Sequence, residues 1–288
     1  MLTRSRSKNE PSTFEFHFIV NFFFDFSQTL VSIFYQKFLH WGLFTDFYIT
    51  KKWLYLWYAP LLYSNIASAI IGNVFCVINR YLALCHCSIY MIKWTLKWSY
   101  FLAAFQFLFP LIMFSFNFWF QCTLVYAEPL HVYIFMVTNP LVSMINNVFI
   151  SILSGIACFI TISMNLIIIS KYNKLMSNIT KNEKRKRISM FFYAILTTSF
   201  LALLSIQQFV RAIFVFKNFK MGLYYITYYL FIILSVSGSA QPFILLILSK
   251  SVRLDFLKFY FGFIFKSKYF SRTIEGTILV TNKIKSTY

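Results

Sequence analysis

Six long apolar stretches dominate this sequence and constrain its fold more than any other feature. A helix needs about 20 mostly apolar residues to cross the hydrocarbon core of a bilayer, and longer helices tilt or project into water. The six stretches that reach this length run approximately over residues 14–38, 54–78, 98–120, 141–170, 188–216 and 223–249. We therefore predict an all-α membrane protein, a transmembrane helix bundle with six spans.

Composition supports helices and identifies the least regular stretch. Hydrophobic residues make up 59% of the chain and charged residues only 12%, and the 38 Phe and 19 Tyr residues provide bulky surface for lipid and for neighbouring helices. This composition differs from the alternating, turn-rich pattern of a membrane β-barrel. The first stretch is the least regular, because Glu15, His17, Asp25 and Gln28 interrupt it.

The positive charge, formally +19, is distributed in a way that indicates membrane orientation. The basic residues lie between the apolar stretches, which argues against nucleic-acid binding. Connections on one side of the predicted bundle, together with both ends of the chain, carry 21 Lys and Arg residues, and those on the other side carry five. Positive charge is retained in the cytoplasm, so we expect both termini there, with residues 1–13 as a basic cytoplasmic segment.

The segments after the last span are predicted to remain on the cytoplasmic side. Within residues 250–270, Leu254, Leu257, Phe261 and Ile264 recur at helical spacing and predict a short amphipathic helix on the inner leaflet. Residues 271–288 are polar and predicted to be disordered. The triplet Asn178-Ile179-Thr180 falls in a loop predicted to be cytoplasmic, so it should carry no glycan.

Asn79-Arg80-Tyr81 stands at the cytoplasmic end of the second span. Arg80 in this place is a candidate switch, because an Arg can exchange a partner inside the bundle for one on a docking protein. The alternative is a flanking charge that reaches to the headgroups. The same helix carries a stripe of small and polar residues, predicted to face neighbouring helices, at Asn65, Ser68, Gly72, Cys76 and Asn79.

Asp25 and Arg211 are the costliest charges inside the predicted spans. Arg211 lies in the outer half of the fifth span with Gln207 and Gln208, and Tyr224 and Tyr228 begin the sixth. We predict a water-accessible pocket between these helices that favours a small polar or anionic ligand. The alternative is that Arg211 extends outward to the headgroups.

Pro242 and the loop over residues 171–187 are candidates for conformational change and docking. A proline inside the last span removes one helical hydrogen bond and permits a kink, so Pro242 is a candidate hinge. The loop carries seven basic residues, which fit an orientation signal or a surface for anionic lipid or a cytoplasmic partner.

The sequence offers no support for catalysis, a metal or a cofactor. Its four His residues are dispersed, and neither a His-Glu-x-x-His motif nor a Gly-rich phosphate loop is present. The five Cys residues follow no paired spacing that would indicate a zinc site or a disulfide framework. Cys122, the only one predicted near the outer face, is interpreted as a free thiol.

Taken in order, several motifs resemble the nematode serpentine chemoreceptors, a seven-helix, rhodopsin-like family of G-protein-coupled receptors, in its gamma or related v class. The resemblance extends over about residues 14–265. Its motifs are Trp41-Gly42-Leu43-Phe44-Thr45-Asp46, then Asn79-Arg80 followed by Tyr90 and Trp94, the basic stretch before Ile188, and Pro242-Phe243-Ile244-Leu245-Leu246 before Ser249 and Arg253.

The resemblance implies a chemosensory receptor in the plasma or ciliary membrane of sensory neurons, with a heterotrimeric G protein as partner. Arg80 would be the switch contact, Pro242 the hinge, and residues 171–187 the surface that faces the G protein. Two departures stand out: six spans in place of seven, as if the family's first helix were missing, and Cys85, His86 and Cys87 where a proline is usual.

Two other functions compete with a receptor. A transporter needs substrate and coupling-ion groups near the bilayer midplane, for which the sequence offers Asp25 and Asn165. A non-signalling receptor remnant would keep the helices and lose the response. Flux into vesicles, or failure to reach the cell surface, would identify these alternatives.

Overall fold

The computed structural model describes residues 13–86, 90, 94–175 and 181–248. The chain divides into two compact units, residues 1–241 and residues 242–288. The predicted amphipathic segment at 250–270, the tail at 271–288 and the N-terminal segment before Thr13 lie outside the described residues.

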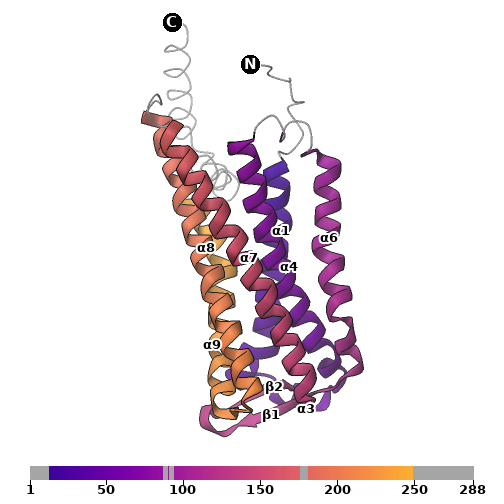
Figure 1. Cartoon of the computed structure of the whole chain (residues 1–288). Helices are drawn as coiled ribbons and strands as arrows, with labels where there is room; N and C mark the ends of the chain where they lie inside the picture. Colours follow the sequence, from indigo (N-terminus) through magenta and orange to yellow (C-terminus); the bar gives the residue numbers. More distant parts are fainter. Residues whose placement is uncertain (1–12, 87–89, 91–93, 176–180, 249–288) are drawn as a thin grey trace, which may run out of the picture. The chain divides into compact units, whose positions relative to one another are not determined.

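Each of the six predicted apolar stretches forms a helix (Figure 1). Over the described residues, five of these helical segments are long and apolar enough to cross a membrane, and the sixth contributes a shorter apolar stretch, Lys220–Val236. The first consists of α1 (Thr13–Ser32), a π-helical turn (Ile33–Lys37) and α2 (Phe38–His40). The other long helices are α4 (Trp53–Cys85), α6 (Leu96–Phe114), α7 (Pro140–Leu175), α8 (Lys181–Phe216) and α9 (Lys220–Leu248). A 3-10 turn, Ser115–Trp119, follows α6. The molecule is an all-α membrane helix bundle in its spans.

Helix α4 is the most buried of the spans and contacts α1, α6 and α7. Its small and polar stripe faces these neighbours, as predicted. The side chain of Gln106 on α6 donates to the backbone carbonyl of Ser68 at 3.0 Å, and Ser27 on α1 donates to Asn65 at 3.2 Å. Gly72 lets the side chains of Asn21 and Gln106 approach the α4 backbone where a methyl group would overlap them.

The polar residues that interrupt the first span lie on its inner face. They recur every three or four residues and are buried against the bundle: Thr13, His17, Asn21, Asp25, Gln28, Ser32 and Gln36. On the opposite face Ile19, Phe23 and Phe26 are exposed, as expected for lipid contact. Because the two faces differ so strongly, α1 is amphipathic in a membrane sense, apolar toward lipid and polar toward its neighbours.

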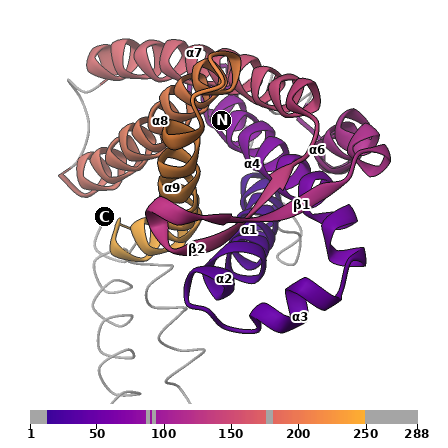
Figure 2. The ribbon, with the colours of Figure 1, turned by 90° about the horizontal axis from the view of Figure 1, so that it is seen from below.

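A two-stranded hairpin, which the sequence analysis did not predict, crosses one end of the bundle (Figure 2). Strands β1 (Cys122–Ala127) and β2 (Val132–Val137) pair antiparallel, with Cys122 opposite Val137. The turn closes through His131, whose φ of 52° is left-handed. The short helix α3 (Thr45–Thr50) lies at this same end, called the hairpin end below (Figure 1).

The hairpin is anchored by one aromatic side chain. Phe135 on β2 is fully buried, and its ring contacts four tyrosine rings with centroids 5.0 to 6.0 Å away, on Tyr35, Tyr48, Tyr55 and Tyr58. Edge-on and offset ring pairs of this kind add stabilisation beyond the area they bury. The ring therefore joins β2 to the first span, α3 and α4.

Candidate functional site

A cavity of about 30 Å³ lies directly under the hairpin. On this measure one water needs roughly 10–15 Å³, so the cavity has room for about two waters. Its walls come from five elements: α4, β2, α7, α8 and the part of α9 before Gln241. Its polar side chains are those of Tyr58, Tyr63, Ser143, Arg211, Tyr224 and Thr227, and we call it the Arg211 cavity.

Arg211 is the only cation among the residues that line this cavity. Its side chain is 8% exposed. Among the described residues, its Nε and Nη1 atoms have no hydrogen-bond partner. Its positive charge lies within electrostatic range of the phenol groups of Tyr58 and Tyr63. Tyr58 also accepts a hydrogen bond of 2.8 Å from Gln36, which fixes the position of that phenol.

The structure brings some of the predicted pocket residues together and separates others. Arg211 and Tyr224 line the same cavity. Gln207 is buried and donates instead to the backbone carbonyl of Ile226 at 3.1 Å, and the ring of Tyr228 stacks on His40 with centroids 5.0 Å apart. Gln208 is fully buried, and its amide atoms have no partner among the described residues. Sequence analysis missed the contribution of α4, α7 and β2, because one sequence carries no signal of which distant elements meet.

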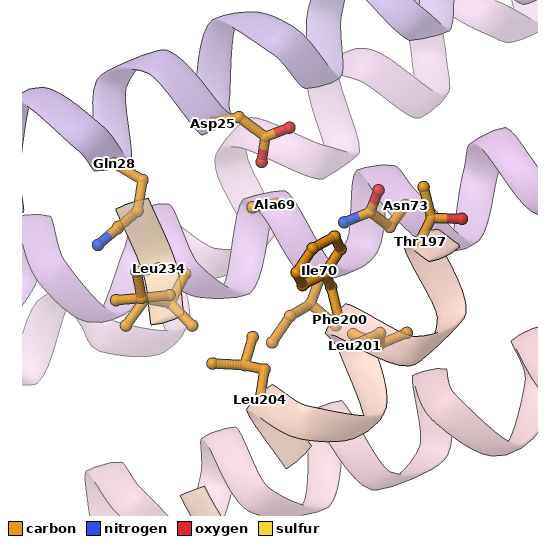
Figure 3. A pocket seen from close by; sticks show the side chains of 11 residues that line it. Asp25, Gln28, Ala69, Ile70, Asn73, Thr197, Phe200, Leu201, Leu204 and Leu234 are labelled. Carbon is orange, nitrogen blue, oxygen red and sulfur yellow. The ribbon is translucent and has the colours of Figure 1, made fainter. Parts of the chain in front are cut away.

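Asp25 lines a second cavity, also of about 30 Å³ (Figure 3). Figure 3 shows Asp25 and Gln28 on one side and Asn73 and Thr197 across from them. The remaining lining is apolar, from α4, α8 and Leu234 of α9. Asp25 accepts a hydrogen bond of 3.3 Å from Asn21, so the predicted need of this carboxylate for a polar neighbour is met within α1.

Asn79 and Arg80, the candidate switch residues, lie in the last two turns of α4, far along the helix from the hairpin end. Asn79 is 1% exposed, and its amide atoms have no partner among the described residues. Arg80 is half-buried. Tyr81 contacts His86 through a hydrogen bond of 3.2 Å between its hydroxyl and the ring Nε2. The roles assigned to Asn79 and Arg80 stay predictions.

Pro242, the candidate hinge, lies within α9, and the boundary between the two units falls immediately before it. The structure describes only the backbone of this part of α9 and shows one conformation of it, so the hinge stays a prediction.

Cys122 lies in the hairpin, where burial raises the pKa of its thiol to about 11, opposed by a hydrogen bond with the Ala59 backbone. The thiol is therefore protonated at neutral pH.

The comparisons with known proteins give one family. A sequence model of the serpentine type 7TM GPCR chemoreceptor Srv family matches residues 1–261. No curated protein matches the chain. Of the two receptor classes that the sequence resembles, the match supports the v class and not the gamma class. Because it covers far more than half of the 288 residues, this chain belongs to the Srv family of serpentine seven-transmembrane G-protein-coupled chemoreceptors.

Proposed function

We propose that the chain detects a small molecule in the Arg211 cavity and signals to a heterotrimeric G protein at the opposite end of the bundle. The observation that carries the proposal is the cavity itself, in a member of a chemoreceptor family. It combines convergent polar side chains with apolar walls, as small-molecule sites do.

The placement of the cavity suits a receptor because several elements meet there. Side chains from α4, α7, α8, α9 and the hairpin line it, so a ligand contacts all five at once. A ligand shifts a conformational equilibrium only by its difference in affinity for the two states. A site shared by five elements offers such a difference whenever one helix moves relative to the others.

The charge distribution supports the direction of signalling. The hairpin end carries five lysines, whereas the opposite connections carry Arg80, Lys97 and the seven basic residues of 171–187. Positive charge is retained in the cytoplasm. The hairpin end then faces outward and receives the ligand, and the Arg80 end faces the G protein, in the plasma or ciliary membrane of a sensory neuron.

A cell assay that reports G-protein dissociation tests this function. Cells that express the receptor are exposed to a panel of small molecules. Surface labelling confirms that each variant reaches the cell surface. Thr227 is buried in the cavity wall, so Thr227→Trp fills the cavity and should abolish the response. Ile232→Trp is the matched control, because Ile232 is exposed on the same helix.

The signalling end is tested in the same assay. Arg80→Ala should lower G-protein activation while ligand binding to the purified receptor persists. A response that survives Thr227→Trp unchanged would place the ligand elsewhere. Activation that survives Arg80→Ala would remove the switch role of Arg80.

A further inference from the structure

Arg211 is a positive charge held inside the bundle without a carboxylate partner among the described residues. A buried cation is costly unless it is paired and hydrogen-bonded. The described carboxylates do not supply the pair. Asp46 on α3 and Glu128 in the hairpin turn are exposed at the hairpin end, and Asp25 lines the other cavity. The Arg211 cavity thus presents to a ligand a positive charge that no described carboxylate compensates.

Reaching outward to the headgroups does not relieve this charge. A lipid-facing Arg near a helix end keeps its head in the polar layer, and its side chain is then well exposed. Arg211 is instead buried, while Phe209 and Ile213 are the exposed residues of the same turns of α8. The alternative raised by the sequence, an Arg that extends to the headgroups, is therefore wrong for this structure.

The groups around Arg211 match a carboxylate. A guanidinium presents paired N–H donors in a planar fork that fits the two oxygens of a carboxylate. The hydroxyls of Tyr58, Tyr63, Tyr224 and Thr227 line the same cavity and are further donors. Val137, Val215 and Leu223 form an apolar part of the wall that suits a short hydrocarbon chain.

The charge and the size of the cavity restrict which ligands can bind in it. One cation lines the cavity, so a single negative charge neutralises it, whereas a dianion would leave a net charge buried. Because a volume of about 30 Å³ has room for about two waters, only the smallest carboxylates enter without rearrangement of the walls. The hairpin end also attracts anions, because its described residues carry five lysines, Lys37, Lys51, Lys52, Lys217 and Lys220, against two carboxylates, Asp46 and Glu128.

We propose that the ligand of the Arg211 cavity is a short-chain monocarboxylate whose carboxylate is bound by the guanidinium of Arg211. The inference rests on the proposed function, since it names the chemical class of the ligand for that same cavity.

The test compares an acid with its neutral isostere on the full chain in lipid nanodiscs. Propionate, propionamide or chloride is added at increasing concentration at neutral pH, and the midpoint temperature of unfolding is measured. A ligand that binds only the folded state raises this temperature. Propionate should raise the midpoint, and propionamide and chloride should not. This comparison needs no variant and so does not depend on the folding of a mutant.

Variants then locate the effect. Arg211→Gln should weaken propionate binding by at least about tenfold, because the charge-assisted pair is lost. Arg211→Lys keeps the charge without the fork and should give an intermediate loss. Lys97→Gln, which removes one exposed positive charge near the start of α6, is the matched control and should bind as the parent does.

The failure of this inference is distinguishable from failure of the proposed function. If propionamide or chloride matches propionate, or if Arg211→Gln binds propionate normally, the carboxylate inference is overturned. The proposed function still stands in that case if another ligand activates the receptor and Thr227→Trp blocks it. If propionate activates the receptor and Arg211→Gln abolishes the response in a surface-expressed protein, both are supported.

Discussion

The ring of Phe135 stacks on the ring of Tyr58, with centroids 5.0 Å apart and an interplanar angle of 26°. Both residues also line the Arg211 cavity, so the contact that holds the hairpin on α4 forms part of the cavity wall. Phe135→Ala should lower the free energy of unfolding by about 3–5 kcal/mol, because it removes a fully buried ring and leaves a void among four tyrosines. Unfolding of the detergent-solubilised protein by added SDS measures the loss.

The control for Phe135 is another aromatic residue of the same hairpin. Tyr126 on β1 is 46% exposed, so Tyr126→Ala should cost less than about 1 kcal/mol. Equal losses for the two variants would show that the hairpin is held by its strand pairing and not by the Phe135 ring.

The helices and the hairpin differ in how much of them the sequence predicts. Six helices follow from apolar length alone, because a chain in lipid must satisfy its backbone hydrogen bonds within each span. The hairpin does not, since β1 and β2 are short and each is stable only when paired with the other and packed under Phe135. Average hydropathy also conceals the polar stripe of α1, which becomes evident when His17, Asn21, Asp25 and Gln28 are placed on one helical face.

A reciprocal pair of amides joins the 3-10 turn after α6 to α7. Asn117 donates to Asn146 at 3.0 Å, Asn146 donates back at 2.6 Å, and both side chains are buried. Replacing either one with Leu leaves the other amide without this partner, so each single variant should lose about 1–3 kcal/mol. The double variant should lose less than the sum of the singles.

A double-mutant cycle measured by SDS unfolding isolates this pair. Hydrogen bonds between membrane helices contribute roughly 0.6 kcal/mol on average and at most about 1.7 kcal/mol. We expect a coupling energy toward the upper part of that range, because two bonds are involved. Strictly additive losses would mean that the two amides act independently.

Two glycines in the middle of helices, Gly72 and Gly155, should differ in how much a substitution by Ala changes stability. A Cβ at Gly72 would overlap the side chains of Asn21 and Gln106, which both take part in the hydrogen bonds between α1, α4 and α6. Gly72→Ala should therefore destabilise the protein by about 1–3 kcal/mol. At Gly155 on α7 nothing lies within 4 Å of a Cβ, so Gly155→Ala should be neutral or gain up to about 1 kcal/mol. Thermal unfolding in micelles compares the two, and a neutral Gly72→Ala would contradict the close packing of α1 and α6 on α4.

The candidate site was predictable only where its residues are neighbours along the chain. Arg211 was recognisable because a charged side chain inside a membrane span is energetically costly unless it is paired or hydrated. Tyr224 was recognisable because it begins the next helix. Tyr58, Tyr63 and Ile134 come from segments more than 70 residues away from Arg211, and no pattern in one sequence says that α4 and β2 meet α8. Gln207 and Tyr228 do not line this cavity with Arg211, because a helix turns successive residues toward different neighbours.

Glycosylation tests which end of the bundle faces outward. Asn178 comes between α7 and α8 in the sequence, on the side predicted to be cytoplasmic, and should stay unmodified when the protein is expressed in a eukaryotic cell. The variant His131→Asn with Tyr133→Thr completes an acceptor triplet in the hairpin turn. Asn tolerates the left-handed φ of 52° at this position better than most residues, so the turn is preserved.

The double variant should gain a glycan, seen as a mass shift that a glycosidase reverses, and His131→Asn alone should not. A glycan on Asn178, with none on the double variant, would invert the orientation and place the Arg211 cavity on the cytoplasmic side, where an external ligand has no direct access to it.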